Sequence, residues 1–259
     1  MQELLRSLPN LRAIDLAQPW RVGMPRWPTH PPFLYSLTKM HGETVLEGGV
    51  SSAADAIALG THTGTHIDAL GHFSCAGCLH GGLEAAPRQS YTGGLQEHSI
   101  ENVGLIARRG VLFDVAGREG VETLNEDFVI TPRHLETAQP APLEPGDVAL
   151  VRTGWAKYFA SPARFQNELR LPGVDLAGAR WLSERGVFAV GSDTLAFEKT
   201  PSPRMEVHVH LLVEKGIHII EVLNLEALAA SGAAEFLFVA SPLKIVGATG
   251  SPLRPFALC

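Results

Sequence analysis

The residues with the clearest chemical potential lie in one short stretch, Thr61–His72, which reads THTGTHIDALGH. The stretch holds three of the eleven histidines of the chain together with an aspartate. His62, His66 and Asp68 are separated by even numbers of residues, so in an extended chain their side chains point to the same side. Imidazole and carboxylate groups are ligands that zinc and manganese both accept. We therefore predict that these three residues bind one divalent cation.

The local sequence favours a strand over a helix at this position, because β-branched residues alternate with the candidate ligands. A fully extended chain would separate the two imidazoles by roughly 13 Å, which is close to the limit for binding one ion. We therefore expect the backbone to bend at Gly64, the residue that permits it. The alternative is a polar strand edge whose histidines bond to the backbone and hold no ion.

Composition and charge limit the classes of function. The chain has 259 residues, 45% of them hydrophobic and 19% charged, which is enough for a substantial core. No run of eighteen apolar residues is present, which excludes a membrane-spanning helix, and the charged start MQELLRSLPNLRAIDL does not resemble a secretory signal. The net charge is −6 and the basic residues are scattered, so nucleic acid and membrane surfaces are not expected partners. We expect a cytoplasmic globular protein.

The three cysteines are Cys75, Cys78 and Cys259. An odd number argues against a disulfide framework and fits a reducing compartment. Cys75 and Cys78 form a CxxC pair flanked by His72 and His80, which could be a zinc knuckle or a redox pair. A structural zinc needs four ligands and the chain has no second CxxC, so two reduced thiols in a glycine-rich loop are preferred.

The second half of the chain has a regular pattern of apolar runs. The expected strands are 147–153, 187–193, 217–223 and 235–245, and the expected helices are 175–186, 207–216 and 224–232. This alternation predicts an α/β domain. The N-terminal third is richer in turns and predicts additional β-structure packed against that domain. Because no repeat or linker interrupts the chain, we expect residues 1–259 to form a single domain.

The stretch HTGTHIDALGH closely resembles the HxGTHxDxxxH signature of the cyclase-like metal-dependent hydrolases, a family that includes kynurenine formamidase and isatin hydrolase. Other segments similar to this family follow in the right order: MPRWPTHPPF (24–33), LVRTGW (150–155), VGSDT (190–194), VHVHLLVEKGIHIIEVLNL (207–225) and GATGSPLRP (247–255). The resemblance implies a swivelling β/β/α fold, which is a mixed sheet with flanking helices.

The resemblance also implies the metal ligands. It assigns a first ion to His62, His66 and Asp68, and a second ion, where one binds, to a downstream His…Glu pair with Asp68 as the bridge. That pair is matched by His208 and Glu221, with His210 as the alternative histidine. The ions implied are Mn²⁺ or Zn²⁺, one or two per chain.

Roles in catalysis and substrate binding follow from the same resemblance. His72 matches the histidine that acts as general base and acid. Trp27 and Phe33 lie in a segment similar to one near the substrate, where they could hold an aromatic ring or could simply belong to the core. The family also implies a homodimer or a larger homo-oligomer.

Together these features predict a metal-dependent hydrolase of an activated amide, either a cyclic amide such as isatin or an N-formyl aryl amide. A bound divalent ion lowers the pKa of its water towards ~7, and His72 would return a proton to the departing nitrogen. The alternatives are a lactone hydrolase, a metal-dependent cyclase or dehydratase, and a non-catalytic protein that binds a small molecule. The sequence lacks GxSxG, GxxxxGK[ST] and a GxGxxG that follows a strand, so nucleophilic serine and nucleotide chemistry are unsupported.

Overall fold

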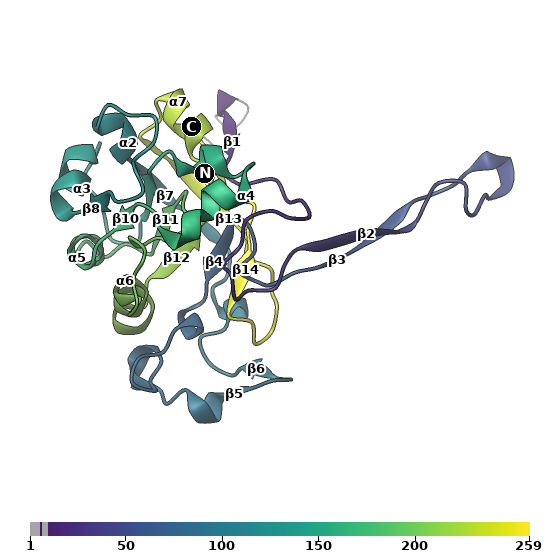
Figure 1. Ribbon diagram of the computed structural model, residues 1–259, viewed down its shortest axis with the longest axis horizontal. Helices are drawn as coiled ribbons and strands as arrows, with labels where there is room; N and C mark the ends of the chain where they lie inside the picture. The colour runs from purple at the N-terminus through teal and green to yellow at the C-terminus, as the bar shows by residue number, and fades with distance from the viewer. Residues whose placement is uncertain (1–5, 7–9) are drawn as a thin grey trace.

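A nine-stranded mixed sheet forms the centre of the protein (Figure 1). The structure, a computed structural model, describes residue 6 and residues 10–259. Across the sheet the strands are β1 (Ala13–Asp15), β15 (Phe256–Leu258), β13 (Glu235–Ala240), β7 (Ile106–Asp114), β9 (Val148–Arg152), β11 (Ala189–Ser192), β12 (His218–Glu221), β4 (His66–Asp68) and β14 (Gly250–Pro252). Strands β7, β9, β11 and β12 run parallel, and the strands on either side of this group pair antiparallel.

The parallel strands of this sheet are buried on both sides, because in the described part of the chain several helices pack on one face and a single helix, residues 226–231, packs on the other. Every residue of β9, β11 and β12 is buried, as expected for apolar runs such as VALVR in a parallel sheet. Figure 1 shows most of the helices gathered on one side of the sheet. The helices are α2 (Val115–Arg118), α3 (Pro132–Ala138), α4 (Pro162–Gln166), α5 (Leu176–Ser183), α6 (Glu206–His208), the π-helix η9 (Val209–Lys215) that continues α6, and α7 (Glu226–Ser231).

The strand sequences alternate between two apolar cores. Val111 and Phe113 of β7 pack into one core with residues of α3, α5 and η9. Leu112 of β7 points to the opposite core, which also contains Leu228 of α7 and Phe238 of β13. Side chains alternate between the two faces of a strand, so the continuous run in β7 supplies both cores.

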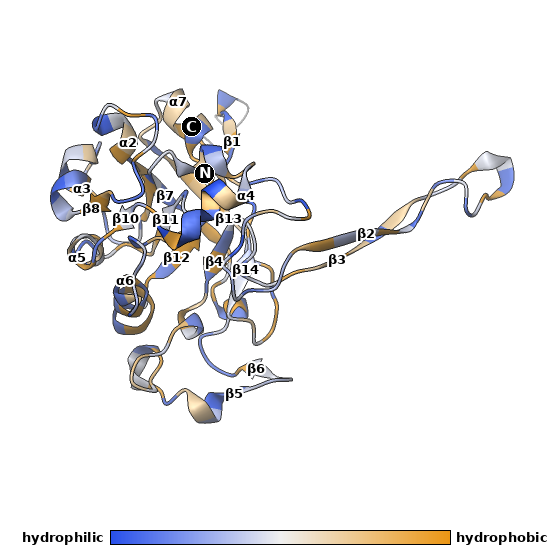
Figure 2. Ribbon diagram, in the orientation of Figure 1, coloured by the Kyte–Doolittle hydropathy of each residue, from blue (hydrophilic) through white to orange (hydrophobic). Residues whose placement is uncertain are grey.

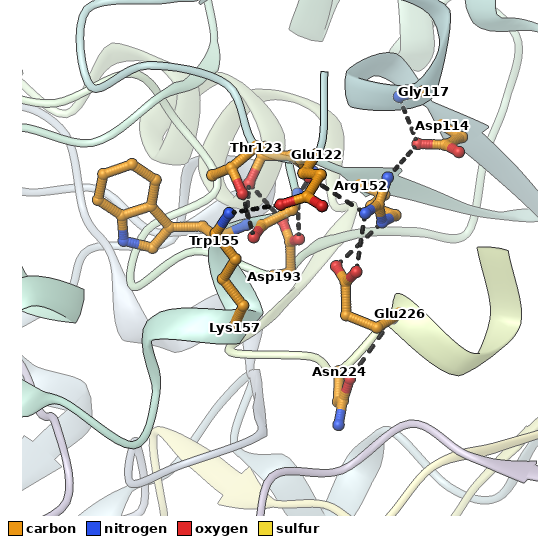
Figure 3. Close-up of polar contacts among 12 residues, drawn as sticks. Asp114, Gly117, Glu122, Thr123, Arg152, Trp155, Lys157, Asp193, Asn224 and Glu226 are labelled. Atoms are coloured by element: carbon orange, nitrogen blue, oxygen red, sulfur yellow. Dashed lines mark hydrogen bonds and ion pairs between the residues drawn. The ribbon is translucent and has the colours of Figure 1, made fainter. Parts of the chain in front are cut away.

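The order of elements predicted for the second half of the chain is confirmed. The expected strands correspond to β9, β11, β12 and β13, and the expected helices to α5, to α6 with η9, and to α7. Arg152, at the end of β9, is fixed by ion pairs to Asp114 at 2.8 Å and to Glu226 at 2.7 Å (Figure 3). These contacts tie the carboxyl ends of β7 and β9 to the start of α7.

The N-terminal third departs from its prediction in one segment. Strands β1 and β4 join the main sheet as expected, but β2 (Leu34–Lys39) and β3 (Ala54–Ala58) pair only with each other. Figure 1 shows this hairpin extending far from the body, so the expectation that it packs against the domain is wrong. Two smaller pairs complete the fold: β5 (Gln89–Ser90) with β6 (Gly94–Leu95), and β8 (Val129–Ile130) with β10 (Gly173–Val174). None of the helices in the described ranges is long and apolar enough to cross a bilayer.

Candidate metal centre

The predicted ligand strand is shorter than the sequence suggested. Only His66–Asp68 form the strand β4, while residues 61–65 form a turn. His66 and Asp68 share one face of β4 as predicted, with His66 Nε2 3.6 Å from Asp68 Oδ1. His62 reaches the same place because the chain turns back, and its Nδ1 lies 2.7 Å from Asp68 Oδ1. The structure therefore brings the three predicted ligands together, although by a turn rather than by a straight strand.

The turn depends on Gly64, where the bend was expected. Its φ angle is +61°, in the left-handed region that glycine adopts at little cost. A Cβ atom at this position would lie 2.6 Å from Nε1 of Trp20, so a larger residue has no room. The carbonyl oxygen of Gly64 then accepts a hydrogen bond from Nδ1 of His66 at 2.7 Å. This leaves Nε2 of His66 facing the carboxylate of Asp68.

The downstream pair also reaches the site. Glu221 of β12 lies opposite His66 in the β4–β12 ladder, and its Oε2 is 3.5 Å from His66 Nε2. His208, at the end of α6, places its Nε2 3.3 Å from Glu221 Oε1 and 3.9 Å from Asp68 Oδ2. Potential ligand atoms of Asp68, His208 and Glu221 lie within 4.8 Å of one another. The alternative His210 does not take part: its Nε2 forms a hydrogen bond with the hydroxyl of Ser183, and its Nδ1 forms one with the carboxylate of Glu214.

Glu198 is a member of the site that sequence reasoning missed. It is 1% exposed, and its Oε2 accepts a 2.5 Å hydrogen bond from Nδ1 of His208. A carboxylate behind a histidine fixes the orientation of the ring and leaves the other nitrogen free for a metal. Glu198 follows β11 in an irregular segment, so no periodic pattern marked it in the sequence.

The charges of the site favour a cation. Three carboxylates, those of Asp68, Glu198 and Glu221, are each no more than 5% exposed, and Oδ2 of Asp68 has no hydrogen-bond partner among the described residues. Burial alone would raise the pKa of Asp68, but the neighbouring rings of His72 and His62 hold it well below its usual range. Burial disfavours the cationic form of His208, yet Glu198 and Glu221 raise its pKa to about 10. A buried surplus of negative charge with one unpaired oxygen fits a divalent cation.

His72 lies close to the predicted ligands. Its ring stacks on that of His62 with the centroids 3.9 Å apart, and burial lowers the pKa of His72 to about 3. Potential ligand atoms of His62, Asp68 and His72 also lie within 4.8 Å of one another. The ring is therefore neutral near pH 7 and is placed either to accept a proton beside the ions or to bind one of them.

A cavity of about 180 Å³ opens onto these groups, smaller than a pocket for a drug-sized ligand. Its polar lining residues include His62, His66, His72, His208 and Glu221. Its apolar lining residues, called the apolar wall below, are Trp27, Phe73, Leu195, Ala196 and Met205. Of the two aromatic residues predicted near the substrate, Trp27 lines this cavity. Phe33 does not line it, because its ring packs in an apolar cluster with Met24 and Trp155.

His30 is the second residue that the sequence did not single out. It lines the cavity, and its ring lies 5.2 Å from that of His62 and 6.3 Å from that of His72. Nδ1 of His30 is buried and has no hydrogen-bond partner in the described chain. Burial lowers the pKa of His30 to about 4. Its position in the Pro-rich segment 24–33 was the only available signal.

A buried polar network surrounds Asp193, two residues before the cavity residue Leu195 (Figure 3). Asp193, which follows β11, accepts hydrogen bonds from Thr153 N at 2.9 Å, from Thr153 Oγ1 at 2.6 Å and from Gly154 N at 2.8 Å. Burial raises the pKa of Asp193 to about 6. These contacts fix the start of the segment that carries Leu195 and Ala196 into the cavity.

The cysteines form no part of this centre. Cys75, Cys78 and Cys259 are free thiols, and the groups of potential metal ligands found in the described residues contain none of them.

Comparison of the sequence with known protein families identifies the family of this chain. The sequence model of the Cyclase family, described as "Putative cyclase", matches residues 14–199, which include the whole ligand motif. The chain belongs to this family. The resemblance noted in the sequence is thereby confirmed. The α/β fold class is confirmed as well, because the solved structures of a novel cyclase and of an isatin hydrolase superpose on nearly the whole chain.

Proteins similar to this chain include named enzymes. A kynurenine formamidase of Bacillus cereus is 28% identical over 241 residues, covering 93% of this chain and 94% of the relative. A crystal structure of a novel cyclase has a TM-score of 0.89 at 29% identity, covering 99% of this chain and 90% of that chain. The structure of isatin hydrolase A from Ralstonia solanacearum has a TM-score of 0.74 at 24% identity, covering 99% of this chain and 96% of that chain. This likeness shows that the two proteins share a fold.

Proposed function

We propose that the protein is a metal-dependent hydrolase that cleaves the C–N bond of a small activated amide. The observation that carries this proposal is the cluster of His62, His66, His208 and Glu221 around Asp68, all within 4 Å of that carboxylate or of one another, beside a small cavity with apolar lining residues. The kynurenine formamidase relatives and the isatin hydrolase folds support amide substrates. The substrate class proposed is an N-formyl aryl amide or a cyclic amide such as isatin.

The residues have distinct tasks in this proposal. His62, His66 and Asp68 would hold one divalent cation, Mn²⁺ or Zn²⁺, and His208 and Glu221 would hold a second with Asp68 shared. When bound, such a cation lowers the pKa of its water, so that hydroxide is available for attack near neutral pH. It also polarises a carbonyl group.

His72 would manage the proton. Its ring stacks on that of His62 with the centroids 3.9 Å apart and lines the cavity, so it could accept a proton from the attacking water and return it to the departing nitrogen. Trp27 and Phe73 would hold the planar ring of the substrate against the apolar wall and exclude water from that side. The absence of paired cysteines fits a reducing, cytoplasmic location.

The deciding experiment is turnover by protein reconstituted with Mn²⁺ or Zn²⁺ in water labelled with ¹⁸O. The substrates form a panel of aryl formamides, isatins and lactones. We expect at least one amide to be consumed and its product acid to carry one ¹⁸O atom. Product without ¹⁸O would indicate a cyclase or dehydratase, and preference for lactones would indicate an esterase-type hydrolase. Tight binding of the panel compounds without turnover would indicate a binding protein.

A further inference from the structure

Cys75 and Cys78 form a motif of the sequence that the candidate metal centre does not use. They lie in the segment that joins β4 to β5, which carries both hydrophobic and hydrophilic residues (Figure 2). Both are free thiols, and Cys75 is exposed while Cys78 is half-buried. The sequence predicts two reduced thiols here and leaves a redox pair as an alternative, so the geometry of the pair decides what the thiols can do.

The two cysteines face each other across a tight turn. The backbone N–H of each donates a hydrogen bond to the carbonyl oxygen of the other, and both bonds are 2.9 Å long. The turn residues Ala76 and Gly77 have φ angles of +49° and +78°, as in the type I′ turns that close two-residue hairpins. Cys75 and Cys78 are therefore a hydrogen-bonded antiparallel pair, whose side chains point to the same side of the ribbon.

This pairing brings the two thiols within reach of one another. The Cα atoms of a hydrogen-bonded antiparallel pair are about 5.5 Å apart, which is also a common separation in disulfides. The Cβ atoms of such a pair are up to about 5.5 Å apart, whereas a disulfide needs about 3.8 Å. A bond between the two sulfur atoms therefore requires a small closure of the turn, without rearrangement of the chain, and the closed bond would be strained.

Contacts on both sides hold the turn in this conformation. The backbone N–H of Ala85 donates a hydrogen bond of 2.9 Å to the carbonyl oxygen of Gly77. Leu79, which directly follows the second cysteine, is 4% exposed. Phe73, two residues before the first cysteine, packs against the core formed with α3, α5 and η9. Because the chain has little freedom left to lose, each thiol meets the other at a high effective concentration.

We propose that Cys75 and Cys78 are a modification site, which a small-molecule disulfide such as oxidised glutathione converts into an intramolecular disulfide. The exposed Cys75 reacts first: its thiolate attacks one sulfur of the oxidant, whose S–S bond breaks, and one glutathione thiolate leaves. The sulfur of Cys78 then attacks that of Cys75 in the mixed disulfide, and the second glutathione thiolate leaves. Two protein thiols are oxidised, one glutathione disulfide is reduced, and the two thiol protons pass to the two glutathione thiolates.

The modification should be reversible. A disulfide that must draw its Cβ atoms together is strained, and strained or exposed disulfides are reduced more readily than structural ones. We therefore expect millimolar reduced glutathione to restore both thiols. This agrees with the expected reducing compartment, where disulfides are usually transient. The site does not depend on the proposed hydrolase activity.

Mass spectrometry of the purified protein gives the first test. Reduced protein is equilibrated in buffers that run from reduced to oxidised glutathione, and free thiols are then blocked with N-ethylmaleimide. In the oxidised buffers we expect the peptide with both cysteines to lose two hydrogen atoms and to take up no maleimide. Cys259 serves as the internal reference, because it has no partner thiol in the described chain and burial raises its pKa.

Three results of this titration would overturn the proposal. The first is a dithiol that persists in oxidised glutathione. The second is a lasting mixed disulfide, or a link between two copies of the chain, in place of the intramolecular bond. The third is a disulfide that survives millimolar reduced glutathione, since this bond would be structural rather than reversible.

Single substitutions test the order of attack. Cys78→Ser removes the resolving thiol, so we expect a mixed disulfide with glutathione to accumulate at Cys75. Cys75→Ser leaves only the half-buried thiol, which should form its mixed disulfide several-fold more slowly. Equal rates in the two variants would show that exposure does not select the attacking thiol.

The turn itself is tested at Gly77, which keeps both thiols in place. A Cβ atom there would meet open space, but a branched side chain disfavours the positive φ of +78°. We expect Gly77→Val to need an about tenfold more oxidising glutathione buffer for half-conversion. Gly81→Val is the matched control, because Gly81 has a φ of +74° and open space around it but lies outside the ring that the disulfide closes. Equal shifts in both variants, or no shift in Gly77→Val, would show that the turn does not create the site.

Discussion

His66 and Glu221 are direct partners across β4 and β12, and His66 Nε2 lies 3.5 Å from Glu221 Oε2. Opposed residues of an antiparallel pair point to the same side of the sheet. The backbone ladder thus aligns a ligand from the N-terminal third with one from the C-terminal quarter. Both halves of the candidate centre are fixed by strand pairing, and only His62, His72 and His208 depend on turns or helix ends.

Substitution in the ligand strand should remove the metal. His62→Ala and Asp68→Asn each delete a ligand of the first ion, so we expect elemental analysis of purified protein to find most of the bound metal lost. His210→Asn is the control, because His210 bonds only to Ser183 and Glu214 and should leave the metal content unchanged. Metal retained at the parent level in both ligand variants would disprove the assignment.

Glu221 should determine whether a second ion binds. Titration of metal-free protein to saturation is expected to give two ions per chain, because Asp68, His208 and Glu221 form a second ligand group. Glu221→Gln keeps the shape of the side chain but removes its charge, and should reduce the number to one. A single ion in the parent protein would show that this group is not a separate site.

Glu198 should act on the metal through His208. Glu198→Gln weakens the hydrogen bond that orients the ring, so we expect metal affinity to fall about 10–100-fold in competition with a chelator. Glu214→Gln is a matched control, since Glu214 makes the same kind of contact at 2.7 Å with Nδ1 of His210, away from the cavity. Equal effects of the two substitutions would mean that Glu198 serves stability alone.

His72 should carry protons. Removal of a general acid–base group typically costs about 10²–10⁴-fold in rate, so His72→Asn should lower kcat on amides by that factor and retain the metal. The loss should be smaller for esters or lactones, whose oxygen leaving groups need less protonation. Because His72 also lies within ligand distance of Asp68, metal content is measured beside kcat. Parallel loss of metal and activity would make His72 a ligand instead.

Acid should destabilise the metal-free protein through the buried histidines. Burial holds the pKa of His72 at about 3 and that of His30 at about 4, both below the usual 6.5. Between pH 6.5 and these values the unfolded chain binds more protons, so the free energy of unfolding falls as pH falls. For His72 the slope is at most about 1.4 kcal/mol per pH unit. Urea denaturation with a chelator should show a shallower slope for His72→Asn between pH 6 and 4, and identical slopes would argue against this titration.

The sequence predicted those parts of the fold and site that have a local cause. Apolar periodicity marked β9, α5, β11 and β12, and even spacing marked His66 and Asp68. Gly64 was expected to bend the chain because no other residue tolerates such a turn so readily, and the structure has its positive φ there. Choosing His208 over His210 required the family resemblance, since the two differ only in which side of one helix they occupy.

The remaining features depend on contacts between distant segments. Glu198 and His30 lie outside any periodic element, and only the folded chain brings them to the cavity. Phe33 could not be separated from Trp27 because both are aromatic residues in one Pro-rich segment. The β2–β3 hairpin has the composition of an ordinary strand pair, and no local pattern in the sequence indicates that it projects from the body.

The position of β4 between β12 and β14 determines when the centre can exist during synthesis. The strand with His66 and Asp68 leaves the ribosome early, but both of its neighbours belong to the last quarter of the chain. Its pairing must close loops of more than a hundred residues, which is entropically costly and slow. A nascent chain that has not yet reached β12 and β14 therefore carries the ligand motif without the pocket, and the complete candidate centre can form only after both strands have been synthesised.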